Sequence, residues 1–378
     1  MKMKYGQERN GEKRGDIQAI VAKAEKGPGR LAKCELEALL EAEGEEERIL
    51  LEAAYRVKIQ TVGKKVALRG LVETGNICEK NCFYCGIRRG NGSVKRYQLP
   101  EEDVLRMARW AWEKGYGSVV LQGGEIESGE NTARVERILG AIREWGGDGF
   151  GVTLSLGEQE EDVYRRWKEA GAHRYLLRIE TSNPQLYSEW HPADHSWKRR
   201  VECLRVLRNL GYQTGTGVMW GLPGQTVSDL ADDVEFFRDR DADMIGMGPF
   251  IPHPDTPLGA GRTVTPEWAA EQVRLGLRMI AATRLQLHDV NIAATTAMQA
   301  LDPLGREKAL GAGANVMMPN VTDAVWKKAY RLYPGKPCLD ETSEACSACL
   351  ETRIRSMGEE ILWGKRGDSP HAQAAGRG

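Results

Sequence analysis

The chain has 378 residues, of which 41% are hydrophobic and 28% charged, and its 53 basic and 54 acidic side chains leave a formal net charge of −1. This is the composition of a soluble globular protein, and the charge balance excludes a global field favouring nucleic acid or an anionic membrane. No stretch approaches the roughly 18 consecutive apolar residues of a membrane span. The N-terminal region lacks the apolar core of a signal peptide, so we expect a cytoplasmic protein.

The predicted elements begin with a helical extension over residues 1–62, and strands then alternate with amphipathic helices over 63–325. Apolar runs predict strands at 66–73, 118–122, 150–155, 174–180, 214–220, 243–248, 290–295 and 314–319. Helical periodicity predicts connecting helices at 101–115, 131–145, 160–171, 195–210, 227–239, 266–284 and 304–311. This α/β pattern favours a (β/α)8 TIM-type barrel, with an open doubly wound sheet as the alternative.

Two further segments follow the predicted barrel. Residues 326–363 form a C-terminal segment that contains three cysteines. Residues 364–378 are polar and glycine-rich, so we expect a disordered tail there. In the barrel itself, catalytic groups are expected just after the strands, because the active sites of such barrels lie at the carboxyl ends of the strands.

Six of the eight cysteines fall in two tight triplets, while Cys34 and Cys203 stand alone. Clustered cysteines in a cytosolic chain indicate metal binding rather than disulfides. The two single cysteines are interpreted as small packing residues.

The first triplet, Cys78, Cys82 and Cys85, has the spacing CxxxCxxC and directly follows the first predicted strand. Three thiolates can hold three corners of a 4Fe–4S cube and leave the fourth iron without a protein ligand. A zinc site would need a histidine as well, and the nearest one in sequence is His173. A fully ligated ferredoxin cluster would need a fourth cysteine nearby in the fold.

This motif, which ends in the aromatic–cysteine pair Tyr84–Cys85, resembles the radical S-adenosylmethionine (SAM) superfamily. The resemblance implies that the amino and carboxylate groups of SAM chelate the open iron. It also implies that electron transfer from the reduced cluster breaks the sulfonium and yields a 5′-deoxyadenosyl radical. Tyr84 is then a further cofactor-binding residue.

Residues at later strand ends fit the same resemblance. Gly123, Gly124 and Glu125 resemble the segment that supports the amino group of the SAM methionine, and a glycine pair lets the backbone approach a ligand closely. By resemblance, Glu180 contacts the SAM ribose and Arg200 the SAM carboxylate.

Two more strand-end residues receive roles in the same way. Met219, before the turn at 221–226, resembles the adenine-side segment, with core packing as the alternative. Arg178 would face the substrate cavity. A charged pair such as Arg178 and Glu180 at the end of a buried strand must be paired internally or meet a ligand.

Several stretches narrow the resemblance to the HydE family of FeFe-hydrogenase maturases, with biotin synthase and methylornithine synthase as relatives in architecture. They span roughly residues 45–363 and read CGIRRGN (85–91), TLSLGE (153–158), WKEAGAHRYLLRIET (167–181), GLPGQT (221–226), GPFIPHPDTPLG (248–259), ATTAM (294–298) and GANVMMPN (313–320).

The HydE resemblance implies a substrate and partners. The substrate would be a small iron complex bearing cysteine, carbon monoxide and cyanide, delivered by a partner maturase, and a reductant protein would supply electrons. The adenosyl radical would attack the sulfur of this complex.

The polar cavity that such an anionic guest requires has predicted lining residues. Guanidinium and hydroxyl groups bind anionic ligands by charge-assisted hydrogen bonds, and the two threonines have strand packing as their alternative. His253 is either part of a lid or a structural histidine. The residues expected in the cavity are Arg178, Thr295 and Thr296, with Met317 and Pro319.

The second triplet, Cys338, Cys346 and Cys349, lies beyond the last predicted strand. Some HydE proteins carry an accessory cluster at this spacing, so the resemblance implies a second iron–sulfur cluster, 2Fe–2S or 4Fe–4S. A zinc site and three metal-free thiols are the alternatives.

Two other functions stay open at this point. A radical SAM mutase acting on an amino acid, as in methylornithine synthase, would share the barrel and the SAM site. A non-catalytic iron–sulfur scaffold would need the cysteines but no SAM pocket, so the strand-end residues argue against it.

Overall fold

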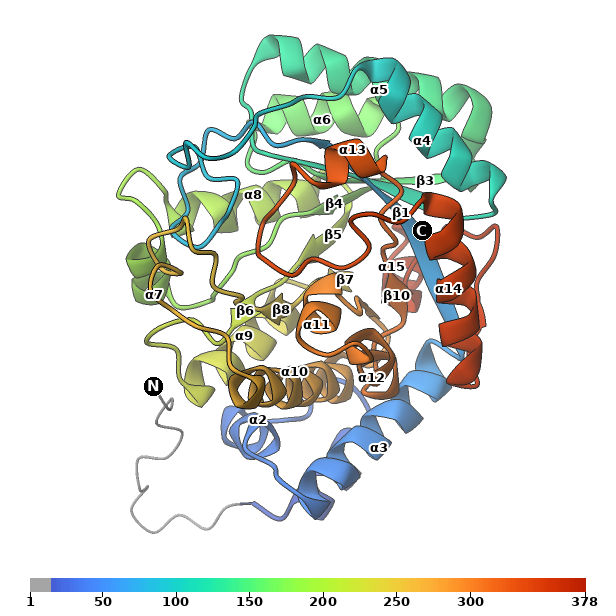
Figure 1. Ribbon diagram of the computed structural model, residues 1–378. Coiled ribbons are helices and arrows are strands. Elements are labelled where there is room, and N and C mark those ends of the chain that lie inside the picture. The colour runs from blue at the N-terminus through green and yellow to red at the C-terminus, as the bar shows by residue number, and fades with distance from the viewer. Residues whose placement is uncertain (1–14) are drawn as a thin grey trace.

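The computed structural model describes residues 15–378. The expected N-terminal extension is seen only from residue 15, because its first 14 residues lie outside the described residues. The chain there forms α1 (Ile17–Ala24), α2 (Lys33–Leu40) and α3 (Glu45–Thr61). Figure 1 shows α2 and α3 in blue, where α2 packs against α9 (Val227–Asp239) and α10 (Pro266–Leu287) and α3 packs against α10.

One parallel sheet forms the centre of the described chain, with its strands in the spatial order β10-β1-β2-β3-β4-β5-β7-β9. The two ends of this row meet, because a parallel bridge joins Ala293 to Val316 and the N–H of Ala294 donates to the Val316 carbonyl at 2.8 Å. The strands of this barrel are β1 (Lys65–Gly75), β2 (Ser118–Gly123), β3 (Gly151–Ser155), β4 (Arg174–Leu176), β5 (Gln213–Thr216), β7 (Met244–Ile245), β9 (Asn291–Ile292) and β10 (Val316–Met317). The predicted (β/α)8 architecture is confirmed, and the open doubly wound sheet is excluded.

Five predicted strands are shorter than expected at the mouth of the barrel. Those expected at 243–248, 290–295 and 314–319 leave the barrel sheet early, at the ends of β7, β9 and β10. The strand expected at 174–180 ends as β4 at Leu176, and Glu180 adopts a positive φ of 68°. The strand expected at 214–220 is divided into β5 and β6 (Met219–Trp220), and β6 pairs with β8 (Gly248–Pro249) in a separate two-stranded sheet. The strand ends therefore leave the barrel sheet at the place where the site residues were expected.

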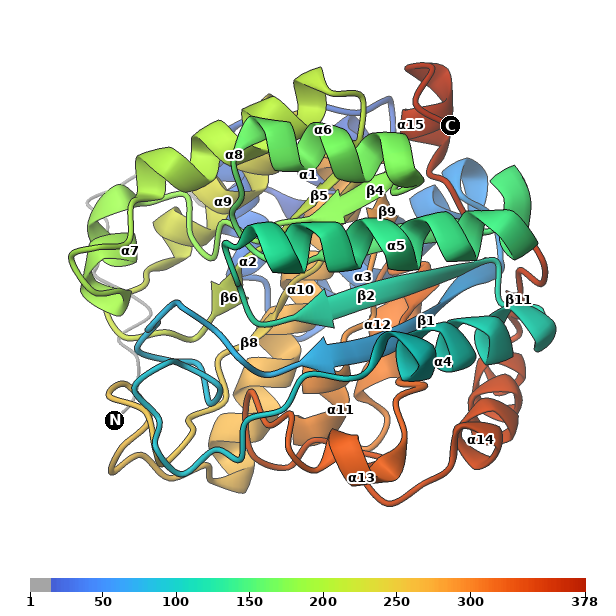
Figure 2. The same cartoon turned by 90° about the horizontal axis from the view of Figure 1, so that it is seen from above.

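Helices surround the barrel (Figure 2). The helix expected at 101–115 is α4, in which Val104, Ala108 and Ala111 are buried and Trp112 is 39% exposed. No described helix is long and apolar enough to cross a membrane. The remaining helices are α4 (Glu101–Glu113), α5 (Gly129–Gly146), α6 (Glu161–Ala170), α7 (Pro184–Trp190), α8 (Trp197–Asn209), α11 (Thr296–Leu301), α12 (Gly305–Gly311), α13 (Ala324–Lys327), α14 (Ser343–Ser356) and α15 (Pro370–Ala374), with a 3₁₀ turn at Gly147–Gly149.

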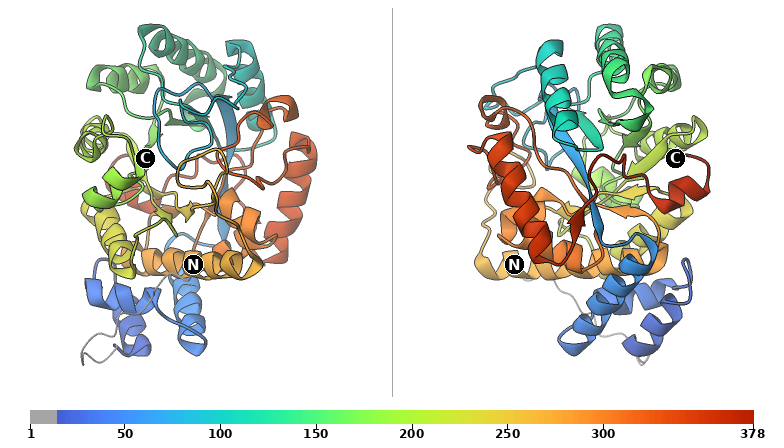
Figure 3. Two further views of the ribbon diagram at one scale, coloured as in Figure 1. Left: turned by 60° about the vertical axis from the view of Figure 1, so that its left-hand side comes forward. Right: turned by 90° about the vertical axis from the view of Figure 1, so that its right-hand side faces the viewer.

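The structure corrects the expectation of a disordered tail at 364–378. β11 (Glu360–Ile361) pairs with the start of β1, and the chain then continues into α15. Asp368 forms an ion pair of 2.5 Å with buried Arg174 and accepts a hydrogen bond of 2.8 Å from Gln213. The polar side chains that led to the prediction of disorder instead contact buried polar side chains at the amino-terminal end of the barrel. The right-hand view of Figure 3 shows the terminal segment, in dark red, crossing the barrel.

Candidate functional site

A cavity of about 350 Å³ opens at the carboxyl ends of the barrel strands. It is the location that the barrel prediction gave for the site. The structure brings together there all of the residues predicted for the first cluster, for SAM and for the substrate threonines. They are Cys78, Cys82, Tyr84, Cys85, Gly123, Gly124, Glu125, Arg178, Glu180, Arg200, Met219, Thr295 and Thr296.

The first cysteine triplet lies on the long loop after β1, whose backbone is held from several sides. The N–H of Phe83 donates to the Trp190 carbonyl at 3.0 Å, and the N–H of Glu125 donates to Cys78 Sγ at 3.4 Å. Burial raises the pKa of the Cys82 thiol to about 12 and also raises the pKa of Cys78. The protein alone therefore favours protonated thiols, and a metal centre would supply the charge that deprotonates them.

The spacing of these sulfurs distinguishes between the kinds of metal centre. Among the described residues, three potential ligand atoms come within 4.8 Å of one another only at Cys338, Glu341 and Cys346. At least one pair of the Cys78, Cys82 and Cys85 sulfurs is therefore farther apart. A tetrahedral zinc ion with Zn–S bonds near 2.3 Å holds its sulfurs roughly 3.8 Å apart. The first triplet thus fits a larger iron–sulfur cluster better than a single zinc ion.

Gly124 brings the end of β2 against the cysteine loop. A Cβ atom at this position would lie 2.0 Å from the Ile77 carbonyl oxygen and 2.8 Å from Cys78 Cβ. Gly157, at φ 81°, similarly leaves room for the Glu125 carboxylate, which a Cβ would approach to 2.1 Å. The glycines at these strand ends are therefore required by close approach.

Four charged side chains form a buried network beside the triplet. Arg200 Nε donates to Glu158 at 2.8 Å, and Lys80 Nζ lies 3.0 Å from Glu125 and 3.1 Å from Glu158. Burial raises the pKa of Glu125. Burial would also raise the pKa of Glu158, but the charges of Arg200 and Lys80 outweigh it and lower that pKa.

The sequence analysis predicted Arg200 and Glu125 but not their partners. Glu158 ends the TLSLGE stretch, shortly after β3, so the strand-end rule could have identified it as a site residue. Lys80 lies between two cysteines of the triplet, and no feature of the sequence marked it as a partner of the two carboxylates. Its role becomes visible only when the loop is folded against β2 and β3.

Arg178 and Glu180 are paired internally, which is one of the two alternatives that the sequence left open. Their side chains form an ion pair of 2.9 Å, and Arg178 donates to the Val218 carbonyl at 2.8 Å. Both side chains also line the cavity, and the ion pair is made by Glu180 Oε2, which is buried. The positive φ of Glu180 is a strained conformation of the kind found at functional sites.

The predictions for the last strand are corrected by one residue. Met317 is fully buried in the core, and neither it nor Pro319 lines the cavity, whereas Met318 does. Successive strand residues point to opposite faces, so a one-residue error exchanges core and cavity. His253 does not line the cavity either. Its Nδ1 accepts from the Asp255 N–H at 3.2 Å, which fits the structural alternative.

Tyr84 and Met219 line the cavity and also pack against a small apolar cluster that includes Trp190 and Phe250. The Tyr84 hydroxyl lies 3.0 Å from His191 Nε2. Met219 therefore packs against the apolar cluster, as the alternative interpretation expected, and also faces the cavity.

The far part of the cavity contains residues that the sequence analysis missed. Lys336 forms an ion pair with Glu73, and the Tyr330 hydroxyl accepts a hydrogen bond of 3.2 Å from Gln122. Three of them, Tyr330, Tyr333 and Lys336, come from the segment that follows the barrel, which has no strand-end rule to identify it. The missed lining residues include Glu73, Gln122, Arg306, Met318, Tyr330, Tyr333 and Lys336.

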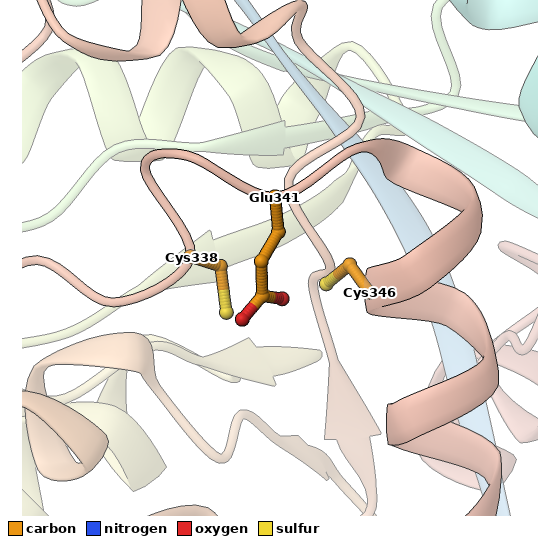
Figure 4. A group of neighbouring side chains, drawn as sticks. All are labelled: Cys338, Glu341 and Cys346. Atoms are coloured by element: carbon orange, nitrogen blue, oxygen red, sulfur yellow. The ribbon is translucent and has the colours of Figure 1, made fainter.

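The second triplet converges only in part (Figure 4). Cys338 and Cys346 lie together with Glu341, which the sequence analysis did not single out, while Cys349 is exposed one turn farther along α14. The interaction between the two thiols lowers the pKa of Cys346 and raises that of Cys338. Of the two single cysteines, Cys203 is buried and Cys34 is exposed.

Comparison with known proteins gives results that agree with this geometry. Residues 72–237 match the model of the radical SAM superfamily. The chain is 44% identical over 319 residues to the [FeFe] hydrogenase maturase subunit HydE of Thermotoga maritima, covering 84% of this chain and 88% of that protein. It is 28% identical over 288 residues to biotin synthase of Geobacillus thermodenitrificans, covering 73% and 82%.

A solved structure also shares the fold. The crystal structure of methylornithine synthase superposes with a TM-score of 0.78 at 22% identity, covering 95% of this chain and 99% of that one. At this identity the likeness concerns the fold alone, and it agrees with the barrel described above.

Proposed function

The chain belongs to the HydE family of the radical SAM superfamily, and from this premise we propose that it is a maturase that activates SAM for the assembly of FeFe-hydrogenase. One observation carries the proposal: the CxxxCxxC cysteines share a single cavity with a strand-end glycine pair and with buried charges at Glu125, Glu180 and Arg200. An iron–sulfur scaffold has no need of these charges.

Each group of residues has a part in this proposal. When bound, a 4Fe–4S cluster and SAM supply the reductive cleavage that gives the 5′-deoxyadenosyl radical. Cys78, Cys82 and Cys85 would hold the cluster. The strand-end residues around them would orient SAM and exclude water from it. The SAM contacts that we propose are Tyr84, Gly123, Gly124, Glu125, Glu180, Arg200 and Met219.

The substrate side of the cavity supports a small anionic guest. We propose that Arg178, Thr295 and Thr296 contact an iron complex bearing cysteine, carbon monoxide and cyanide. Thr295 Oγ1 is buried without a hydrogen-bond partner in the described part of the chain, so it is available to a ligand. Other hydrogenase maturases and a reductant protein are the proposed partners. A cytoplasmic location is part of the proposal, because clustered free thiols suit a reducing compartment.

We further propose a second iron–sulfur cluster at Cys338, Cys346 and Cys349. Cys346 and Cys349 are three residues apart on α14 and so lie on one helical face, and Cys338 approaches that face from the preceding loop. Glu341 is the nearby oxygen ligand that a zinc site would use instead. Iron analysis of wild type against a Cys338/Cys346/Cys349 triple-alanine variant separates the alternatives, because zinc binding would leave the iron content unchanged.

The central experiment is EPR of the reconstituted, dithionite-reduced triple-alanine variant, with and without SAM. A 4Fe–4S signal that changes shape on addition of SAM supports the open iron. Formation of 5′-deoxyadenosine that increases with the iron complex, together with complementation of a strain lacking HydE, supports the maturase function. A product from lysine would favour the amino acid mutase, and absence of 5′-deoxyadenosine with every substrate would favour the scaffold.

A further inference from the structure

Two buried histidines, His191 and His195, contact the loop that carries the first cysteine triplet. Both belong to the connection between α7 and α8, and they are 2% and 8% exposed. The loop from Cys78 to Cys85 forms no helix or strand, so its shape depends on contacts with neighbouring elements. The sequence analysis gave neither histidine a role.

The protonation of His195 follows from its two partners. The Asn81 N–H, which lies between Cys78 and Cys82 in the chain, donates to His195 Nε2 at 3.0 Å. A backbone N–H can only donate, so Nε2 must be the unprotonated nitrogen. The proton is then on Nδ1, which donates to Asp194 Oδ1 at 2.7 Å. His195 is therefore a neutral imidazole whose acceptor nitrogen binds the cysteine loop.

His191 has the same arrangement with different partners. Its Nδ1 lies 2.7 Å from the Tyr187 carbonyl, which can only accept, so Nδ1 carries a proton. Burial lowers the pKa of His191 to about 3, so the ring is neutral and its Nε2 is an acceptor. The Tyr84 hydroxyl, 3.0 Å away, then donates to Nε2. Because Tyr84 lines the cavity, His191 orients a side chain that we propose as a SAM contact.

A backbone hydrogen bond lies between these two side-chain contacts. The Phe83 N–H donates to the Trp190 carbonyl at 3.0 Å, so segment 190–195 holds the cysteine loop at three residues. The same segment leads directly into α8, which Ser196 caps and which carries Arg200. The connection therefore fixes the cysteine loop relative to another proposed SAM contact.

We propose that His191 and His195 form a clamp that positions the cysteine loop, with each histidine holding a different part of it. His195 holds the Asn81 backbone and thereby the cysteines on either side of it. His191 holds the Tyr84 ring at the cavity. Both are positioning residues, since neither lines the cavity itself. The inference rests on the proposed function, because the cluster and SAM belong to that function.

Aromatic packing is the competing role for these rings. The His191 ring stacks on Tyr187 with the centroids 3.9 Å apart and meets Tyr84 edge-on at 5.2 Å. H191F keeps an aromatic ring but removes the acceptor. In the other position, H195Q keeps an acceptor in place of the ring, whereas H195L removes the acceptor. These variants separate hydrogen bonding from packing.

The first measurement is hydrogen exchange of the metal-free protein, with mass spectrometry of peptides that cover residues 78–86. In H195L we expect exchange near Asn81 to be about 3- to 10-fold faster than in wild type, as for the loss of one hydrogen bond. H195Q should stay within about twofold of wild type, because its side-chain oxygen can accept from the same N–H.

Two further variants make this measurement decisive. D194A removes a side chain that is 61% exposed and should accelerate exchange less than H195L, because the His195 ring loses only the bond that orients it. It decides the question if H195L does not fold. H288F is the control, since His288 is also buried but bonds the Ala24 carbonyl at 3.1 Å among the N-terminal helices. Exchange of the cysteine loop should be unchanged in H288F.

The second measurement uses reconstituted proteins in the Cys338/Cys346/Cys349 triple-alanine background, so that only the first cluster contributes iron. H195L should lose iron to a chelator about 3- to 10-fold faster than its parent. H191F should lose iron at the parent rate, but its dissociation constant for SAM in an EPR titration should rise about 3- to 10-fold. A purely structural role would lower the thermal midpoint of both variants without dividing the two effects.

The clamp is refuted if metal-free H195L exchanges like wild type, if H195Q is as impaired as H195L, or if H191F and H195L change iron loss and SAM binding alike. Failure of the proposed function has a different result. Wild type would then show no SAM-dependent EPR signal, while the faster exchange of metal-free H195L would still be present.

Discussion

At the scale of single residues, the buried network beside the first triplet is balanced in charge. Two cations, Lys80 and Arg200, face two carboxylates, Glu125 and Glu158. The methionine part of SAM carries one ammonium and one carboxylate, so it can enter by exchanging partners with this network and leave no buried charge unpaired. This balance explains how a cofactor with both charges is received by residues that are already paired with one another.

Replacing Arg200 by Gln should therefore weaken SAM binding without removing the cluster. The variant leaves Glu158 with Lys80 at 3.1 Å and the more distant Arg199 at 3.5 Å, and it removes the proposed partner of the SAM carboxylate. We expect the dissociation constant for SAM to rise about 10- to 100-fold, as for the loss of a hydrogen bond to a charged group. The measurement is an EPR titration of the reduced protein with SAM.

Arg205 of the same helix gives a matched control, because it is 55% exposed and pairs with Glu202 at the surface. R205Q should bind SAM like wild type. Equal weakening in R205Q and R200Q would mean that the net charge of α8, and not the buried contact, is responsible.

Gly124 makes a second prediction possible at this scale. In G124A the new methyl group would clash with the Ile77 carbonyl and the Cys78 side chain. The clash can be relieved only if the backbone of one of these segments shifts. We expect destabilisation of about 1–3 kcal/mol, as for overpacking, and a clear loss of iron after reconstitution. In the control, G129A, a Cβ meets nothing within 4 Å, and both quantities should remain at the wild-type level. Full iron incorporation in G124A would contradict the close-approach argument.

Single residues also show how far the sequence could predict the site. The strand-end rule directed attention to Arg178, Glu180 and Thr295, and the family resemblance then gave Arg178 and Glu180 their expected roles. It missed Lys80 and Lys336, since their roles depend on partners 45 or more residues away, at Glu125 and Glu73. Pairing between distant loops has no periodicity that a sequence could display.

At the scale of elements, the ends of the strands at the barrel mouth were harder to predict than the middles of the same strands. The runs at 174–180 and 214–220 are apolar enough to read as continuous strands, yet each leaves the sheet near its end. Gly217 allows this for the second run, because a Cβ there would lie 2.0 Å from the Gly246 carbonyl oxygen. Hydrophobic periodicity reports burial but not whether a buried residue remains in the sheet.

An ion pair buried between elements leads to a third prediction. Lys58 of α3 and Glu359, just before β11, are 2.6 Å apart and fully buried, and they fasten the N-terminal helices to the end of the chain. Removing one partner, as in K58M, leaves a buried charge and should destabilise the protein by about 3–5 kcal/mol. The double variant K58M/E359L replaces the pair by apolar groups and should recover most of this loss. Thermal unfolding of both single variants, the double variant and wild type measures the coupling, and additive effects would contradict it.

At the scale of the whole molecule, the barrel has two polar ends with different purposes. The mouth contains the cavity, whose charges are arranged around ligands. The amino-terminal end contains Arg69, Arg174 and Gln213, which are buried and point toward the terminal segment. Asp368 supplies the carboxylate for this layer. The terminal segment therefore closes the barrel at the amino-terminal ends of its strands. We expect its removal or alteration to affect the stability of the fold and not SAM chemistry.

The variant D368N tests this closure. Burial alone would raise the pKa of Asp368, but the His173 ring, whose Nε2 lies 3.6 Å from the carboxylate, and the charge of Arg174 outweigh it and hold that pKa well below its usual range. The carboxylate thus stabilises the folded state above the unfolded pKa of about 3.9, and this contribution is lost as the pH falls toward the folded value. At pH 7, D368N should lose about 3 kcal/mol, because it leaves Arg174 buried without a counter-ion.

The pH dependence separates this explanation from a general packing defect. The difference in thermal midpoint between wild type and D368N should be constant from pH 6 to 8 and should shrink below about pH 4, where the wild-type unfolded chain takes up the proton. A packing defect would instead persist at low pH. D239N, which removes an exposed partner of Arg238, should change the midpoint little at any pH. Because Asp368 lies at the opposite end of the barrel from the cysteines, D368N should still show the SAM-dependent EPR change at temperatures where it is folded, and loss of that change would mean that the two ends are coupled.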